Sequence, residues 1–507
     1  MLFNTYGFIF IFLPITLIIF LKIGRLSHHR VAMSWLILSS LFFYGWWNPI
    51  YLGLILGSII FNYALGVILS NSYLINRKLI LTFGIVVNIG LIGYYKYTNF
   101  VIDNINILLN SNFYVEQIVL PLAISFFTFQ QIAYLVDAYR GETREYNFLH
   151  YCLFVLFFPQ LIAGPIVHHK EMLPQFADDK SYRLNYENIS IGITVFIVGL
   201  FKKVVLADNV ALYATPIFLD AESNHPLTFF SAWGGALAYT FQLYFDFSGY
   251  SDMAIGIARM FGIHLPINFN SPYKATSIID FWRRWHITLS RFLKEYIYFP
   301  LGGNRKGTFR RYLNLLITML IGGLWHGAGW TFIVWGGLHG SFLIINHAWQ
   351  ALYRYSNINL TDDLLIARYI YRGLTFVAVV VSWVFFRAKD LTTAMCILQS
   401  MMDISLLTLK QCYWYLLTYP QNIFAHGLDQ VTYLILLSII VWYFPNTQEF
   451  MFHYNLELTK ESKNSEYPVT KYITWEPKLR WALICGALGF MSIISLTRVS
   501  EFLYFQF

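Results

Sequence analysis

The stretch Gly322-Gly323-Leu324-Trp325-His326-Gly327-Ala328-Gly329-Trp330 lies between two apolar runs, Tyr312–Ile321 and Thr331–Ile345. These runs are typical of membrane spans, so we expect the histidine between them to lie at membrane depth. An ionisable side chain inside a bilayer is costly and commonly marks a functional site. The four glycines loosen the helix and allow another backbone or a ligand to come close. On these residues alone, His326 either bridges two packed helices or takes part in chemistry.

The composition indicates a polytopic membrane protein. Of the 507 residues, 57% are hydrophobic, 19% aromatic and only 12% charged, whereas soluble domains carry about 25% charged residues. The net charge is +8, but the basic residues cluster in short loops. Membrane topology and contact with lipid headgroups explain this pattern, so we expect a lipid bilayer and no nucleic acid as partner. Neither a disulfide framework nor a metal site is expected, because the four cysteines lack such spacing; they are Cys152, Cys396, Cys412 and Cys485.

Apolar segments recur along the whole chain. The first, Phe8–Leu21, is followed rather than preceded by basic residues. This order predicts an uncleaved span with its N-terminus outside and a cytosolic loop after it. We therefore expect residues 1–507 to form a single all-α integral-membrane domain of roughly 11–14 hydrophobic segments. The further predicted spans are 31–46, 51–70, 79–95, 118–136, 189–206, 229–247, 250–263, 311–327, 330–349, 366–386, 429–445 and 481–497.

Two other segments are not expected to span. Residues 151–163 form a short run that ends in Phe158–Pro165, which contains two prolines. Broken backbone at membrane depth is tolerated where protein or water surrounds it, so a re-entrant segment is predicted. Asn99–Glu116 carries acidic but no basic residues, which suits an external loop.

The interval His264–Tyr312 is strongly basic, with nine Lys and Arg residues. The positive-inside rule places it on the cytosolic side. Within it, Ser277 has the properties of a helix N-cap, with Asp280 three residues later. The apolar residues that follow share one helical face, which predicts an interfacial amphipathic helix with His286 beside that face. The nine basic residues are Lys274, Arg283, Arg284, Arg291, Lys294, Arg305, Lys306, Arg310 and Arg311.

A third polar cluster, Gln242–Asp252, interrupts what we expect to be an apolar hairpin. Its carboxylates, Asp246 and Asp252, are six residues apart and need not face each other. Salt bridging or helix capping is the first interpretation, with Arg259 or the basic interval as partner. An ion site of a transporter is the functional alternative.

Several catalytic motifs are absent from the sequence. It contains no GxSxG, HExxH or P-loop pattern, and no histidine is followed by aspartate five residues later. Histidine acting as a base remains the candidate chemistry.

Six stretches together resemble the membrane-bound O-acyltransferase family, and within it the membrane component of bacterial alginate O-acetylation systems. The pair Trp-x-x-Trp-His and Gly-Leu-Trp-His-Gly, about forty residues apart in this order, makes a chance match very improbable. The stretches are 121–130, 158–165, 245–255, 281–290, 322–330 and 445–448.

The resemblance implies helices around a central acyl-transfer cavity, with the acyl donor entering from the cytosol and the acceptor from the other side. It assigns the catalytic role to His326, with His286 as its companion. No tightly bound cofactor is expected, and acetyl-CoA is the expected co-substrate. The cationic side chains of the basic interval would then meet coenzyme A phosphates, although lipid phosphates would explain them equally well. Other residues expected at the substrate cavity are Trp285, Trp325, Asp246, Asp252, Arg283 and Arg284.

The expected function is transfer of acetyl groups across a bacterial inner membrane to a polysaccharide outside it, alginate or a similar polymer. A periplasmic or membrane-anchored partner would complete the transfer. Peptidoglycan O-acetylation is the alternative within the family, and a relative uses a carrier-protein donor in teichoic-acid D-alanylation. A transporter without acyl transfer is the alternative from another class, but the sequence shows no repeated halves.

Four further histidines receive structural interpretations. His339 is expected to be a packed residue that bonds to a neighbouring helix. His168 and His169 follow Pro165 and are expected to form a solvated or interfacial cluster with Lys170. His347 receives no role.

Overall fold

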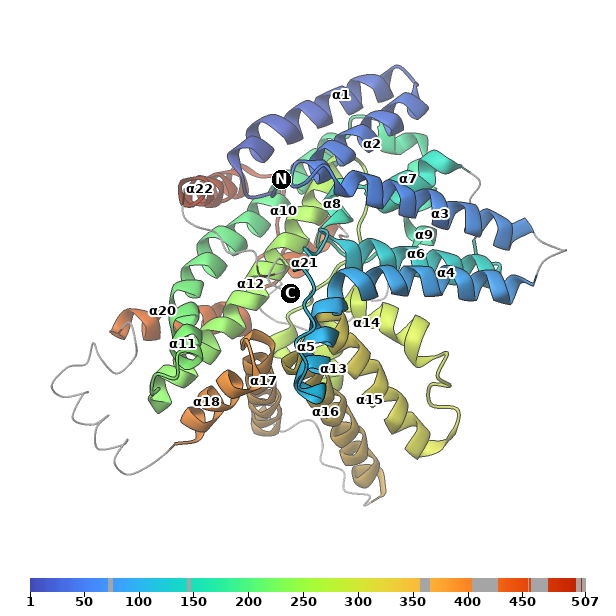
Figure 1. Cartoon of the computed structure of the whole chain (residues 1–507). Coiled ribbons are helices and arrows are strands. Elements are labelled where there is room, and N and C mark those ends of the chain that lie inside the picture. The colour runs from blue at the N-terminus through green and yellow to red at the C-terminus, as the bar shows by residue number, and fades with distance from the viewer. Residues whose placement is uncertain are drawn as a thin grey trace.

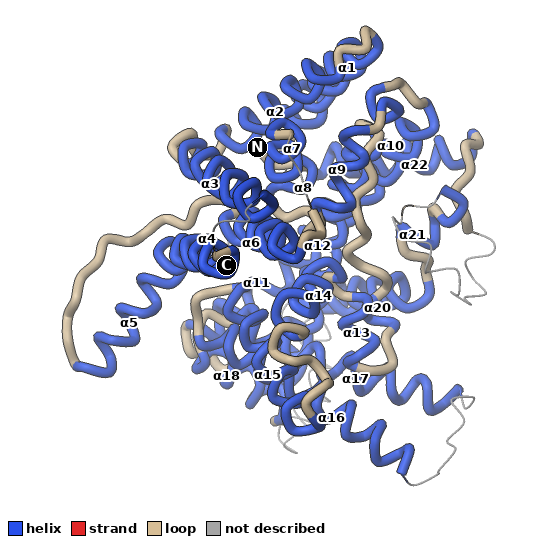
Figure 2. The backbone as a smooth tube through the Cα atoms, turned by 90° about the vertical axis from the view of Figure 1, so that its right-hand side faces the viewer, coloured by secondary structure: helices blue, strands red, loops and turns tan. Residues whose placement is uncertain are grey.

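The computed structural model describes residues 1–71, 76–143, 147–355, 365–403, 427–454, 456, 473–497 and 503, and over these residues it is helical without strands (Figures 1 and 2). Cys412 lies outside the described residues. The helices are α1 (Leu13–Arg25), α2 (His29–Gly45), α3 (Tyr51–Asn71), α4 (Arg77–Ile92), α5 (Thr98–Leu109), α6 (Ile124–Arg140), α7 (Phe148–Leu156), α8 (Phe158–Leu161), α9 (His169–Ala177), α10 (Tyr186–Phe201), α11 (Asp208–Glu222), α12 (Phe229–Met260), α13 (Ile278–Arg284), α14 (Ile287–Leu293), α15 (Gly307–His326), α16 (Trp330–Tyr355), α17 (Leu365–Arg387), α18 (Leu391–Met402), α20 (Gly427–Tyr443), α21 (Thr447–Phe450) and α22 (Leu479–Ser495).

Shorter helical segments join or extend these helices. Those with the wide π-helical turn are η1 (Phe8–Phe12), η2 (Gly93–Tyr97), η4 (Lys202–Ala207) and η6 (Lys294–Tyr298). Those with the tight 3-10 turn are η3 (Asp179–Tyr182), η5 (Pro272–Lys274) and η8 (Phe452–Tyr454). Such π-helical turns commonly lie at functional sites.

Within the described residues, five helical stretches are long and apolar enough to cross a bilayer. Three of them are compound: η1 leads into α1, η2 joins α4 to α5, and η4 joins α10 to α11. The expectation of an all-helical protein is confirmed, whereas the number of 11–14 spans stays a prediction. The five stretches are Phe8–Arg25, Tyr51–Ser70, Arg77–Leu109, Tyr186–Glu222 and Leu365–Arg387.

The 32-residue helix α12 runs through the centre of the molecule, with α10 and α11 packed along it (Figure 1). The prediction of two spans, 229–247 and 250–263, joined by a polar hairpin is therefore wrong. The polar residues of this region are buried inside a continuous helix, where they gain partners from other elements and do not need a turn.

Glycines bring α10 and α12 together. A Cβ atom at Gly199 would lie 2.6 Å from the carbonyl oxygen of Gly249, and one at Gly192 would lie 2.6 Å from that of Gly256. Small residues at such positions allow the close backbone approach by which membrane helices associate. This contact aligns η4 with the polar part of α12.

Two segments differ in detail from the prediction. The segment 151–163 is broken at Phe157 between α7 and α8, and nearly all of it is buried, as expected for irregular backbone surrounded by protein. The proposed external loop Asn99–Glu116 is helical in its first part, where α5 continues from η2. Figure 2 shows α5 and the loop after it at the edge of the molecule.

The predicted amphipathic helix is two helices. Ser277 caps α13 as expected, because its hydroxyl accepts a hydrogen bond from the Asp280 N–H at 3.1 Å. The helix then ends at Arg284, and α14 begins at Ile287. Between them His286 adopts a left-handed backbone with φ of 43°. Only a few per cent of non-glycine residues have positive φ, and such conformations cluster at functional sites.

Candidate functional site

His326 is the last residue of α15 and is buried. Its ring lies between Trp325, Trp335 and Phe386, with centroid distances of 4.8, 5.1 and 5.0 Å. Trp325 belongs to one of the two hydrophobic cores of the molecule and the other two rings to the second. The imidazole therefore lies where the two cores meet.

The glycines beside His326 bring protein, not open space, to the helix end. A Cβ atom at Gly323 would collide with the backbone of Phe332, and one at Gly327 would collide with the ring of Phe332. The expectation that another backbone comes close is confirmed. The α15–α16 pair is closed at this point, which leaves access to His326 from elsewhere.

His286 is fully buried, and its ring centroid lies 6.3 Å from that of His326. Its Nδ1 lies 3.1 Å from Asn268 Oδ1, which also accepts hydrogen bonds from the Thr288 hydroxyl at 3.0 Å and backbone N–H at 3.3 Å. An acceptor opposite Nδ1 favours the tautomer that carries its proton there. Two histidines 40 residues apart in the sequence are thus neighbours in the fold.

A cavity of about 270 Å³ reaches His326. Its walls come from the ends of helices and the loop before α6 that the positive-inside rule places outside the cytosol. We call it the outer cavity. It is lined by Trp47, Lys96, Val119, Leu120, Pro121, Leu122, Ala123, Ile124, Ser125, Phe126, Ile162, Trp325 and His326.

A second cavity, of about 710 Å³, lies at the start of α15. Arg283, Lys294 and Arg311 line it, and the basic interval to which they belong is predicted to be cytosolic. We call it the basic cavity. It extends along α15 to Met319, six residues before Trp325. At 1.5 Å per residue, this leaves about 9 Å of helix between the linings of the two cavities.

Of four residues predicted at the substrate cavity, two line one of these cavities and two line neither. Arg283 lines the basic cavity and Trp325 the outer cavity. Arg284 instead pairs with Asp280, with Nε 2.8 Å from Oδ1. Trp285 packs in the second hydrophobic core, 4.9 Å from Trp383 between ring centroids.

Asp246 and Asp252 have structural partners. Lys203 Nζ lies 2.6 Å from Asp246 Oδ1, and Lys202 Nζ lies 2.6 Å from Asp252 Oδ2. The salt-bridging interpretation is confirmed, but the partners are the lysines of η4 rather than Arg259 or the basic interval. Thr447 also donates a hydrogen bond to Asp252 at 2.6 Å. The adjacent lysines within the predicted span 189–206 are the sequence signal that could have identified these pairs.

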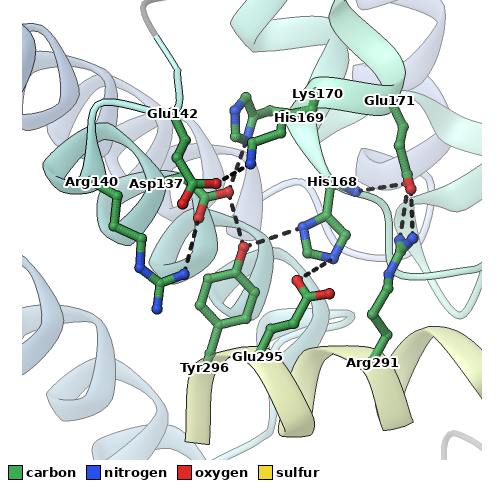
Figure 3. A network of polar contacts seen from close by, with 10 residues as sticks. All are labelled: Asp137, Arg140, Glu142, His168, His169, Lys170, Glu171, Arg291, Glu295 and Tyr296. Carbon is green, nitrogen blue, oxygen red and sulfur yellow. Dashed lines mark hydrogen bonds and ion pairs between the residues drawn. The ribbon is translucent and has the colours of Figure 1, made fainter. Parts of the chain in front are cut away.

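A partly buried polar network fixes the helix that starts after His286 (Figure 3). The Tyr296 hydroxyl donates a hydrogen bond to Asp137 of α6 at 2.9 Å and lies 3.2 Å from His168 Nδ1. Arg291 makes a two-pronged ion pair with Glu171 of α9, at 2.5 and 3.0 Å. Together these contacts hold α14 and η6 against α6 and α9.

His168 and His169 are buried in this network, so the solvated alternative of the prediction is wrong for these two residues, whereas Lys170 is exposed and the interfacial alternative stays a prediction. Burial, with help from the nearby charges of Arg291 and Lys170, lowers the pKa of His168 to about 3, and the ring is neutral at neutral pH. The helix α9 folds back over the protein and covers both side chains, which a loop assignment could not anticipate. His339 is a packed histidine, as expected, with Nε2 2.9 Å from the hydroxyl of Ser382 on α17.

Comparison with known proteins finds one family model and several relatives named as acyl-group transferases. Residues 110–386 match the model of the MBOAT, membrane-bound O-acyltransferase family. A peptidoglycan O-acetyltransferase of Helicobacter pylori is 49% identical over 435 residues, which cover 80% of each chain. A probable alginate O-acetylase of Pseudomonas aeruginosa is 42% identical over 401 residues, 78% of this chain and 73% of that one. A teichoic acid D-alanyltransferase of Streptococcus thermophilus is 29% identical over 238 residues, 45% of this chain and 57% of the relative.

The family match covers more than half of the chain and includes both histidine motifs. The buried histidine pair and the whole of α15 lie within the matched residues. This chain belongs to the membrane-bound O-acyltransferase family.

Proposed function

We propose that this protein takes an acetyl group from acetyl-CoA on the cytosolic side and delivers it across a bacterial inner membrane for O-acetylation of a polysaccharide. The observation that carries this proposal is the histidine pair, His326 and His286, with ring centroids 6.3 Å apart and His326 in the wall of the outer cavity. An acceptor that enters this cavity would meet the imidazole of His326 first, because His286 does not line the cavity.

In the proposed reaction, His326 is the general base. It accepts the proton of a hydroxyl group while the hydroxyl oxygen attacks the carbonyl carbon of the acetyl thioester. The carbon–sulfur bond then breaks, and the coenzyme A thiolate takes up the proton from the imidazolium. General-base catalysis of this kind contributes about 10²–10⁴-fold to a rate. His286, held by Asn268, would orient the donor or support the charge that develops on the carbonyl oxygen.

The basic cavity is the proposed entrance for the donor. Arg283, Lys294 and Arg311 offer three cations at one end of α15, and phosphate groups form strong charge-assisted hydrogen bonds with such side chains. The thioester would then extend along α15 toward His326. In this proposal, donor and acceptor would approach from the two ends of one 20-residue helix.

The proposed acceptor is an extracytoplasmic polysaccharide reached through a periplasmic or membrane-anchored partner protein. The motifs pointed first to alginate. The relative named peptidoglycan O-acetyltransferase is 49% identical, against 42% for the probable alginate O-acetylase. This difference supports peptidoglycan as a candidate beside alginate, and acetylation of isolated polymers by membranes that contain the partner would discriminate between them.

The test uses the full-length protein in membrane vesicles supplied with radiolabelled acetyl-CoA. We expect His326→Ala to reduce acetyl transfer about 10²–10⁴-fold. His286→Ala should also reduce it, but by a smaller factor, since His286 does not reach the outer cavity.

The matched control is His453→Ala, which changes an exposed histidine that lines neither cavity. Undiminished transfer by His326→Ala, with the protein present at its normal level, would remove His326 as the base. Transport of unmodified solute without acetyl transfer by the wild type would favour a transporter instead.

A further inference from the structure

The end of α15 is capped by side chains from a distant element. The last carbonyl groups of an α-helix have no partner within the helix. Here the Tyr97 hydroxyl donates a hydrogen bond to the carbonyl oxygen of Leu324. Lys96 Nζ donates to the carbonyl oxygens of Trp325 at 2.6 Å and His326 at 2.9 Å. Adjacent side chains of η2 therefore satisfy three successive carbonyls that end in His326.

This contact joins parts of the chain about 230 residues apart. Lys96 and Tyr97 belong to the helical stretch Arg77–Leu109. This stretch also holds the start of α16, because Asn104 Oδ1 accepts a hydrogen bond at 2.8 Å from the indole N–H of Trp330. The connection Gly327–Gly329 lies between these two anchors. Glycines give such a connection little conformational preference of its own, so the position of His326 depends on packing and hydrogen bonds with other elements.

The charge of Lys96 is suited to this place. The ammonium group of Lys96 is only partly exposed, and the residue lines the outer cavity beside His326. The C-terminal end of a helix carries partial negative charge, which a nearby cation stabilises, more so when the site is partly buried. A lysine side chain at this helix end therefore stabilises its last carbonyl groups by donating hydrogen bonds to them.

We infer that Lys96 and Tyr97 are positioning residues of the acyl-transfer site, which hold the end of α15 so that the His326 imidazole faces the outer cavity. The inference rests on the proposed function insofar as His326 is the base. Both residues act through the backbone of α15, and neither is required to bind the donor. Their loss should lower kcat and leave the KM for acetyl-CoA almost unchanged.

The first measurement is the steady-state rate of acetyl transfer by Lys96→Gln and Tyr97→Phe in vesicles. We expect kcat to fall about 10–100-fold for Lys96→Gln, because a small misplacement of a catalytic group has effects of this size, and less for Tyr97→Phe. Lys96→Arg retains a cationic donor for two carbonyls and should recover most of the rate. Controls are the exposed Lys78→Met and Tyr186→Phe.

The second measurement does not need acetyl transfer. Diethyl pyrocarbonate reacts with accessible, unprotonated imidazole, and mass spectrometry of the His326 peptide gives its rate. We expect Lys96→Gln and Tyr97→Phe to change that rate several-fold and both control variants to leave it unaltered. If the wild type transfers no acetyl group, the proposed function fails and this arm alone tests the positioning role.

Two outcomes would overturn the inference. One is that Lys96→Gln and Tyr97→Phe both keep wild-type kcat and wild-type reactivity at His326. The other is that Lys96→Gln lowers the melting temperature and raises the KM together with the fall in kcat, without recovery in Lys96→Arg. That second pattern would identify a residue needed for folding in general.

Discussion

Asn268 is the residue that links His286 to its surroundings. Its Oδ1 receives hydrogen bonds from the histidine ring and from Thr288, whose hydroxyl accepts another from the Ile166 N–H at 3.0 Å. One buried amide thus orients the imidazole, stabilises the first turn of α14 and connects both to the loop after α8. At metal sites, loss of a partner that orients a histidine in this way commonly costs about 10–100-fold in affinity or activity.

We expect Asn268→Ala to reduce acetyl transfer by about 10–100-fold, because the Nδ1–H of His286 loses its acceptor. The unfolding free energy should fall by about 1–3 kcal/mol, the range for a buried polar group left without its partner. Transfer assays in vesicles and thermal unfolding in detergent measure the two effects.

Asn185→Ala is the matched control for this prediction. Asn185 caps α10 and accepts hydrogen bonds from the backbone of Glu187 and Asn188, so its loss costs about 1 kcal/mol of stability away from the site. Equal rates for the two variants would show that Asn268 supports the fold and does not position His286.

At the scale of elements, the crossing of α10 and α12 determines where the η4 lysines meet their carboxylates. We expect Gly199→Ala to lower the unfolding free energy by about 1–3 kcal/mol, since its Cβ would lie 2.6 Å from a backbone oxygen that cannot move independently. A Cβ atom at Gly53 in α3 would have no other atom within 4 Å. Gly53→Ala should therefore leave the unfolding free energy unchanged or raise it by about 0.5–1 kcal/mol. Thermal unfolding of both variants in detergent tests the pair, and equal loss of stability would contradict the close crossing.

Hydropathy predicts helices well where one apolar run matches one helix. The runs 366–386 and 429–445 differ from α17 and α20 by only one or two residues at each end. Prediction fails where tertiary contacts supply partners for polar residues. The cluster at 242–252 stays helical because Lys202 and Lys203 neutralise its carboxylates, and no local pattern shows that the pairing partners lie in another span.

The same contrast between local sequence patterns and tertiary contacts applies to the candidate site. The two histidines are recognisable because each is part of a local motif, Trp-x-x-Trp-His or Gly-Leu-Trp-His-Gly. Asn268 and Lys96 belong to no such motif, and their roles arise from contacts between segments far apart in the sequence. Sequence reasoning therefore finds the reactive groups but not the residues that hold them.

At the scale of the whole molecule, the proposed direction of transfer depends on which face of the protein meets the cytosol. The 20 residues of α15 span about 30 Å, close to the hydrocarbon thickness of a bilayer, with the basic cavity near one end and the outer cavity at the other. The distribution of Lys and Arg predicts that the basic cavity is cytosolic and that the loop after α5 is outside.

Single-cysteine labelling tests this orientation. In a variant with its four native cysteines replaced by serine, we expect Asn112→Cys, in the exposed loop after α5, to react with a membrane-impermeant maleimide on intact spheroplasts. Asn304→Cys, at the exposed edge of the basic cavity, should react only after permeabilisation. The cysteine-free protein is the blank, and its acetyl transfer shows that the fold is intact. The reverse labelling pattern would place the basic cavity outside, where acetyl-CoA is absent, and the cations around Arg283 could then no longer be the entrance for a cytosolic donor.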